Sequence, residues 1–366
     1  MGLGAERCRG RAISPSSLAA DSDWGVGGFP SRPGLGSEKA GVGMATYLVR
    51  RVLQLIPTLF VISLLLFGLL AMKPGDPIDE MRRGNPGFTQ ADYDRLREFY
   101  GLDRPWYVQY WRWLGRVVHG DFGTSRQFGR PAADYVFKYR FPNTVLLSGL
   151  SLLLSFSVAV PAGVLSALRQ RGFVDYTITV VSFVGVSIPI FWMGIMLIYI
   201  FAVQFRGFLP AGGLATPGVT GTWPILGDRL RHLLLPVLAL SSLQVAQWTR
   251  FMRSSMLETI QLDFVVTARS KGLSERRVIF KHALRNAILP LITLMGLNVP
   301  ALFSGAILTE TVFNWPGMGR AIYDAILVND FNVAMVSLMF ISLLVLLFNL
   351  LTDIAYALVD PRIRYG

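Results

Sequence analysis

The sequence predicts an all-α, polytopic membrane protein with six transmembrane helices, a short cytoplasmic helix and a large external loop after the first span. Three observations lead to this fold class. Of the 366 residues, 52% are hydrophobic and only 16% are charged, whereas soluble domains carry about a quarter charged residues. The apolar residues fall into six runs without Asp, Glu, Lys or Arg. Basic residues gather beside these runs, which is typical of membrane proteins.

Each uncharged run is at least 18 residues long, and a helix needs about 20 apolar residues to cross a bilayer. The fourth run is the shortest, and we expect a flanking arginine to extend from its end to the interface. Prolines inside several runs are interpreted either as simple kinks or as hinges of a moving bundle. The six runs are 52–72, 141–168, 176–205, 232–249, 286–309 and 331–352.

Lys and Arg in the short connections predict which side of the membrane each connection faces. Fourteen of them lie on one side and four on the other, so we expect both termini in the cytoplasm. Eight of the fourteen fall within 250–285. Residues 73–140 are expected outside, because loops longer than about 60 residues largely escape this rule.

The chain divides into four regions. The first is rich in Gly, Ser, Pro and Arg and lacks an apolar stretch of signal-peptide length, so we treat it as a disordered or non-native leader. The second is the first transmembrane helix, the third an extracytoplasmic loop or cap, and the fourth a membrane domain of five helices. These regions are 1–43, 44–72, 73–140 and 141–366, and the last contains a cytoplasmic loop over 256–285.

The external segment is rich in aromatic residues. A short helix is expected over 92–100 and a turn over 101–105. The aromatic side chains could lie at the level of the lipid headgroups. We favour a small cap on the outer mouth, because so many aromatics can form a satellite core. They are Trp106, Tyr107, Tyr110, Trp111, Trp113 and Phe122.

Composition excludes several kinds of site. Cys8 is the only cysteine, so an intrachain disulfide or a cysteine metal cluster cannot form. The three histidines lie far apart, and no GxxxxGK[ST] phosphate loop occurs. The net charge of +12 comes without a basic stripe interleaved with aromatics, which argues against nucleic acid as a partner. We therefore expect no catalytic residue, no metal and no cofactor in this chain.

The cytoplasmic stretch 263–290 is the most informative part of the sequence. Asp263 can cap a helix that runs to Lys271, and Gly272 suits the left-handed end of that helix. Ser274 can cap a second helix that leads into the fifth span. Small residues, Ala268 and Ser270 among them, leave room for close contact with a partner. An ordinary positive-inside loop would explain the charges here but not this order of helix, glycine, turn and helix.

At this point the sequence resembles the inner-membrane permease subunits of ABC importers, in the dipeptide/oligopeptide (and nickel) branch. The run 267–274 looks like that branch's form of the permease "EAA" loop, and the resemblance covers 44–366. The general pattern starts with a glutamate where this chain has Val266, so the packing role of that glutamate is not carried over. Five further motifs match in order: Pro-Gly-Asp-Pro at 74–77, Gly-Asp-Phe-Gly-Thr-Ser at 120–125, Ser-Ile-Pro-Ile-Phe-Trp at 187–192, Asn-Trp-Pro-Gly-Met-Gly-Arg at 314–320 and Asp-Pro-Arg-Ile-Arg at 360–364.

The resemblance implies a set of partners in the cell inner (plasma) membrane. They are a second homologous permease subunit, two ABC ATPase subunits that bind ATP and Mg, and an extracytoplasmic solute-binding protein that delivers short peptides. It also implies that the cytoplasmic loop docks as a coupling helix into an ATPase subunit. The residues assigned to this role are Asp263, Thr267, Ala268, Arg269, Lys271, Gly272, Leu273 and Ser274.

Polar residues inside the spans are candidates for the lining of a translocation pathway. Ser241, Gln244 and Gln247 share one face of the fourth span, and Asn298 lies in the fifth. Hydrogen bonds between helices are the interpretation that we favour for them, because polar side chains do this routinely in membranes.

No acidic or basic residue lies in the middle of a span. Proton- or sodium-driven carriers normally keep ionisable groups there, so a stand-alone secondary carrier or channel is the weaker alternative. The cargo stays open between a dipeptide, an oligopeptide, a glutathione-like molecule and nickel or another small solute, because the binding protein largely sets it.

Overall fold

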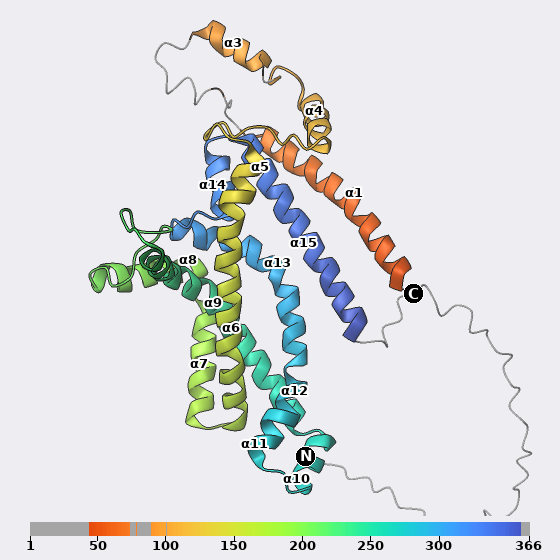
Figure 1. The fold of residues 1–366 in the computed structure, drawn as a ribbon. Coiled ribbons are helices and arrows are strands. Elements are labelled where there is room, and N and C mark those ends of the chain that lie inside the picture. The colour runs from red at the N-terminus through yellow and green to blue at the C-terminus, as the bar shows by residue number, and fades with distance from the viewer. Residues whose placement is uncertain (1–43, 74–77, 79–88, 100, 360–366) are drawn as a thin grey trace, which may run out of the picture. The chain divides into compact units, whose positions relative to one another are not determined.

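The computed structural model describes residues 44–73, 78, 89–99 and 101–359. The predicted leader and the motifs at 74–77 and 360–364 lie outside this part of the chain. The described residues are almost entirely helical and contain no β-strand, as the sequence predicts (Figure 1).

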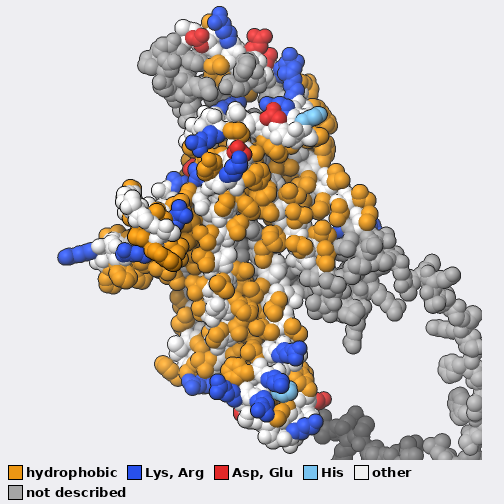
Figure 2. Space-filling model, viewed as in Figure 1, with side chains coloured by type: hydrophobic (Ala, Val, Ile, Leu, Met, Phe, Trp, Pro, Cys, Tyr) orange, Lys and Arg blue, Asp and Glu red, His pale blue; other side chains and the backbone are white. Residues whose placement is uncertain are grey.

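The longest helices pack side by side. α6 (Phe141–Leu168) makes its most extensive contact with α9 (Thr222–Ile260), while α15 (Phe331–Val359) packs on α1 (Met44–Ala71) and α13 (Leu289–Val312). Apolar side chains cover much of the visible face, and Lys and Arg gather at its lower end, over the segments that follow α9 (Figure 2). A wide apolar surface that ends in charged residues is what a bilayer requires of a spanning bundle.

Small residues allow the close approach of α6 and α9. A Cβ atom added to Gly163 would lie 2.6 Å from Cβ of Met252 and 2.8 Å from the Thr249 carbonyl oxygen. Ser155 and Ser241 are buried at the same contact, and the Ser155 hydroxyl lies 3.4 Å from the Ser241 carbonyl oxygen. Membrane helices associate through such small residues because lipid gives them no hydrophobic driving force.

Four helical stretches of the described residues are long and apolar enough to cross a membrane, or five if a bent pair forms one span. The predicted span 232–249 lies inside α9, which carries charged residues on both sides of it. The count of six spans therefore stays a prediction. The four stretches are Val49–Ala71, Ala132–Leu168, Glu275–Gly296 and Phe331–Ile354.

The third predicted span, 176–205, is not one straight helix. α7 ends at Ser187 (Phe173–Ser187), and after a bend of 104° the chain continues as α8 (Ile190–Leu197) and the π-helical segment η3 (Ile198–Gln204). Ile188 is extended, with ψ 123°, which is the conformation that a following proline favours. Pro189 also lacks the N–H group that would continue the helix.

The segment after α1, which the sequence predicts to be external, contains α3 (Gln90–Phe99) and α4 (Trp106–Val118). The first agrees with the predicted helix 92–100, and α4 was not predicted. Tyr110 and Trp113 of α4 are buried against Phe67 of α1 and Met335 of α15, and the Tyr110 hydroxyl lies 2.9 Å from the Ser63 hydroxyl. These aromatics thus complete a core together with membrane helices, whereas Trp106, Tyr107 and Trp111 remain exposed.

The contact between α6 and α9 gives a direct test of the packing. We expect Gly163→Ala to lower the free energy of unfolding by about 1–3 kcal/mol, because the added methyl group has no room. The control is Gly149→Ala in the same helix, where an added Cβ meets nothing within 4 Å. It should leave the thermal unfolding temperature of the purified chain in detergent unchanged or slightly raised. Equal unfolding temperatures for the two variants would contradict this packing.

Candidate functional site

The segment between α9 and α13 forms a compact helical loop. α10 (Asp263–Ser270) follows a turn at the end of α9, and the chain returns through α11 (Glu275–Arg277), the π-helical segment η4 (Val278–Ala283) and α12 (Leu284–Ala287). Figure 1 shows these short elements together at the end of the bundle opposite to α14. The sequence assigns this end to the cytoplasm.

Gly272 ends α10 in the way that the sequence predicts. Its φ is +75°, a conformation that glycine adopts without steric cost. The N–H of Gly272 donates to the Arg269 carbonyl oxygen at 2.9 Å, and the N–H of Leu273 donates to the Ala268 carbonyl oxygen at 3.4 Å. This pair of hydrogen bonds is a Schellman motif, which pairs carbonyl groups left open at the end of a helix.

The helix starts differ in detail from the prediction. Leu262 rather than Asp263 occupies the N-cap of α10, and neither residue makes a side-chain capping bond. Asp263 is instead the first residue of the helix, where its negative charge suits the helix dipole. Ser274 does precede α11, but its hydroxyl group makes no capping bond.

α10 has one face turned to the protein and one turned away from it. Val265 and Ala268 are buried in a core that includes Trp248 and Met252 of α9 and Ala283 of η4. Ala268 is only 5% exposed, so its small side chain lets α10 approach its own bundle rather than a partner. This corrects the interpretation of Ala268 as a residue that leaves room for a partner.

The side of α10 that points away from the protein, its outward face, carries residues three and four positions apart, which is the spacing of residues on one side of a helix. They are Asp263, Val266, Thr267 and Ser270, and all are exposed. Lys271, Gly272 and Ser274 extend this exposed surface into the turn.

The side chain of Arg269 holds the turn that follows α10 in place. Its guanidinium group donates to both carboxylate oxygens of Glu275, at 2.6 and 3.2 Å. The hydrogen bond to Glu275 raises the pKa of Arg269. Exposed ion pairs contribute little stability in general, but a two-point pair restricts the orientation of the groups that it joins.

A buried ion pair ties α7 to α9 near the same end. The guanidinium group of Arg253 donates to both oxygens of Asp175, at 2.7 and 2.8 Å. Asp175 is 4% exposed and also accepts from the Ser166 hydroxyl of α6 and from the Arg171 N–H. Every oxygen of this carboxylate is paired, as the burial of a charge requires.

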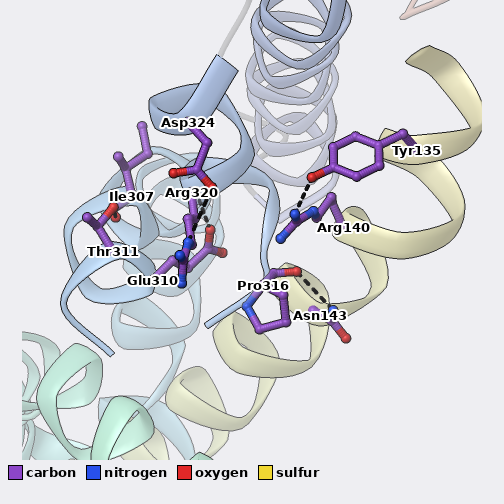
Figure 3. A network of polar contacts seen from close by, with 9 residues as sticks. All are labelled: Tyr135, Arg140, Asn143, Ile307, Glu310, Thr311, Pro316, Arg320 and Asp324. Carbon is purple, nitrogen blue, oxygen red and sulfur yellow. Dashed lines mark hydrogen bonds and ion pairs between the residues drawn. The ribbon is translucent and has the colours of Figure 1, made fainter. Parts of the chain in front are cut away.

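The opposite end of the bundle contains a second buried carboxylate, that of Glu310 in α13. Its side chain accepts a hydrogen bond from the Thr144 hydroxyl of α6 at 2.6 Å and one from the Arg320 N–H of α14 (Met318–Leu327) at 2.9 Å. The Met318 N–H donates to the Thr144 hydroxyl oxygen at 2.7 Å. Figure 3 shows Glu310 beside Arg320, at the start of α14. The carboxylate therefore lies at the positive end of a helix dipole.

Residues of the 314–320 motif form the walls around Glu310. A Cβ atom added to Gly317 would lie 2.1 Å from the Glu310 carboxylate, so only glycine fits there. The Asn143 side-chain amide donates to the Pro316 carbonyl oxygen at 2.9 Å (Figure 3). The Trp315 indole N–H donates to the Asn143 carbonyl oxygen at 3.1 Å. The motif thus joins α6, α13 and α14 at one point.

Sequence reasoning missed Glu310 because the predicted span ends at Thr309. α13 continues to Val312, so this acidic residue belongs to the helix although it lies outside the uncharged run. An acidic residue directly after an apolar run and just before the 314–320 motif was the available signal.

The four candidate pathway residues differ in burial and in hydrogen bonding. Ser241 is buried, and its hydroxyl donates within α9 to the Leu238 carbonyl oxygen at 3.2 Å. Gln244 is partly buried, and its Oε1 has no hydrogen-bond partner. Gln247 is exposed. The Asn298 amide donates within α13 to the Leu294 carbonyl oxygen at 2.7 Å.

Thr144→Val tests the network around Glu310. This nearly isosteric change removes the hydroxyl that serves both Glu310 and the Met318 N–H. We expect a loss of about 1–3 kcal/mol in the free energy of unfolding, the typical effect of a buried polar group without a partner. Thr177→Val is the control, because that exposed hydroxyl bonds only the Phe173 carbonyl of its own helix. Thermal unfolding in detergent checks both variants, and equal unfolding temperatures would contradict the role of Thr144.

Comparison with known proteins covers nearly all of the described chain. The family model of binding-protein-dependent transport system inner membrane components matches residues 159–365, and that of the N-terminal part of such membrane components matches 44–148. The oligopeptide transport system permease protein AppB of Bacillus subtilis is 43% identical over 88% of this chain and 100% of its own length. The di/tripeptide permease protein DppB of Pseudomonas aeruginosa is 38% identical, and the dipeptide permease protein DppB of Escherichia coli 37%, each over 88% of this chain and 99% of its own length. The chain therefore belongs to the family of binding-protein-dependent transport system inner membrane components, the permease subunits of ABC importers.

Proposed function

We propose that this chain is the permease subunit of an ATP-driven importer of short peptides. Its similarity to relatives named as oligopeptide, di/tripeptide and dipeptide permeases, over almost their whole lengths, supports this cargo. The chain works with a second homologous permease subunit, two ATPase subunits and an external solute-binding protein. ATP hydrolysis and its Mg ion belong to the ATPase subunits.

The two-sided burial of α10 is the observation that carries the coupling role. Val265 and Ala268 attach the helix to its own bundle, while its outward face is exposed. The Schellman motif at Gly272 and the pair between Arg269 and Glu275 fix the end of the helix. A partner that moves the outward face therefore moves a rigid element rather than a flexible loop.

The buried contacts of α10 carry that movement into the membrane. The core that holds Val265 and Ala268 includes residues of α6, α9 and α13, among them Ala159, Met252 and Leu291. ATP that binds more tightly to one arrangement of the ATPase pair then shifts the permease between inward-open and outward-open states. The shift needs no catalytic residue in this chain, because it requires only a difference in affinity between the two states.

The outer end receives the cargo in this proposal. The solute-binding protein docks over 73–140 and the 310–330 region, where Glu310, Thr144 and α14 form one hydrogen-bonded unit. This unit ties the end of α13 to α6, so a change at the outer surface reaches two long helices together.

Reconstitution in liposomes tests the assignment as a whole. We expect uptake of a labelled dipeptide only when the second permease, the two ATPases, the binding protein and ATP are all present, because this chain has no energy source of its own. Uptake by this chain alone without ATP would instead establish a stand-alone carrier or channel. ATP-dependent uptake of nickel but not of peptides would contradict the cargo.

Val266→Asp tests the docking of α10. Val266 is 50% exposed on the outward face, so the variant should fold and insert normally. The new carboxylate would be buried without a partner in the docked state, which costs several kcal/mol. We expect co-purification of the ATPase subunits, and with it ATP-dependent uptake, to fall at least about tenfold.

Val118→Asp makes the same change at a 76% exposed position of the external segment and should retain the ATPases. Full retention by V266D would overturn the docking assignment.

A further inference from the structure

The three sides of helix α4 in the external segment carry different kinds of side chain. Tyr110 and Trp113 face the core that α4 shares with α1 and α15. On one flank of this core face, Tyr107, Trp111 and Val118 are exposed. The ring of Trp111 lies 6.1 Å from that of Phe60 in α1. Exposed aromatics beside an apolar spanning helix are typical of the level of the lipid headgroups.

The other flank of α4 is basic. Arg112, Arg116 and His119 follow one another at intervals of four and three residues, so they share one side of the helix end. This side borders a cavity of about 1000 Å³, which Arg126 and Asn332 also line. The cavity therefore brings three arginines and a histidine together at the external end of α1 and α15.

Among the described residues that line this cavity, basic side chains outnumber acidic ones. Asp121 is the only acidic residue among the described ones that line it, and one of its carboxylate oxygens accepts the Gly123 N–H at 2.9 Å. The structure gives Arg112 and Arg116 no ion pair or hydrogen bond with a described side chain. Both guanidinium groups are thus available to an anion from outside the chain.

We propose that this cavity binds a phosphate group, and that the headgroup of an anionic phospholipid in the outer leaflet supplies it. Guanidinium groups match phosphate oxygens in two-point hydrogen bonds. The aromatic flank of α4 and the exposed side of α1, which carries Leu65 and Leu69, would place the acyl chains beside the same helix pair. A soluble anion would make use of the arginines only, so the apolar surroundings favour the lipid. This site is independent of the proposed peptide cargo.

Thermal unfolding of the full chain in detergent tests the proposal. We expect phosphatidylglycerol to raise the unfolding temperature more than phosphatidylcholine, whose choline neutralises its phosphate. In the double variant Arg112→Gln/Arg116→Gln, the phosphatidylglycerol concentration that gives half of the rise in unfolding temperature should increase about 10- to 30-fold. Each arginine near a lipid surface contributes about 1 kcal/mol to the binding free energy. Arg112→Lys/Arg116→Lys keeps the charge but loses the two-point geometry of the guanidinium groups, so its response should lie between those of the wild type and R112Q/R116Q. Inorganic phosphate is the third arm, and an equal effect from it would identify free phosphate as the source.

The matched control removes two charges from the same segment outside the cavity. Arg95→Gln/Arg104→Gln changes exposed residues that do not line it and should respond to phosphatidylglycerol as the wild type does. An unchanged response in R112Q/R116Q, or an equal loss in the control, would overturn the proposal. If R112Q/R116Q cannot be purified, the wild-type protein alone provides the test. Equal stabilisation of the wild type by the two lipids, without an effect of inorganic phosphate, also overturns the proposal.

Discussion

The close contact between α6 and α9 is the constraint on which the rest of the structure depends. Lipid does not drive helices together as water does, so the two backbones must approach closely to gain packing energy. Gly163 permits this approach. Because α9 is a single helix of 39 residues, the contact that holds its middle also fixes the position of both its ends. α10 follows directly after one of these ends.

Two buried carboxylates among the described residues are paired with groups from several helices. Asp175 near one end of the bundle joins α6, α7 and α9 through Ser166 and Arg253. Glu310 near the other end joins α6, α13 and α14 through Thr144 and the Arg320 N–H. Charged groups in the bilayer centre are costly, so polar connections between helices concentrate at the two ends and the middle relies on apolar and small residues.

The loop between α9 and α13 shows how far local sequence signals reach. A glycine at the end of a short helix predicts a left-handed residue, and Gly272 adopts that conformation. Which side of α10 faces the bundle is not a local property. Ala268 and Ser270 are both small, yet Ala268 is buried and Ser270 is exposed, because the position of α9 decides the side to which α10 packs.

The sequence by itself determined the helical membrane class, the apolar runs and the family, because hydropathy, turn residues and motifs are properties of short stretches of chain. Only the tertiary structure decided the 104° bend after Ser187, since a proline in a span is compatible with both a mild kink and a sharp break. It also decided the pairing of Thr144 with Glu310, which are 166 residues apart in sequence. Contacts between distant residues depend on how several helices fill space together, and no short stretch of sequence contains that information.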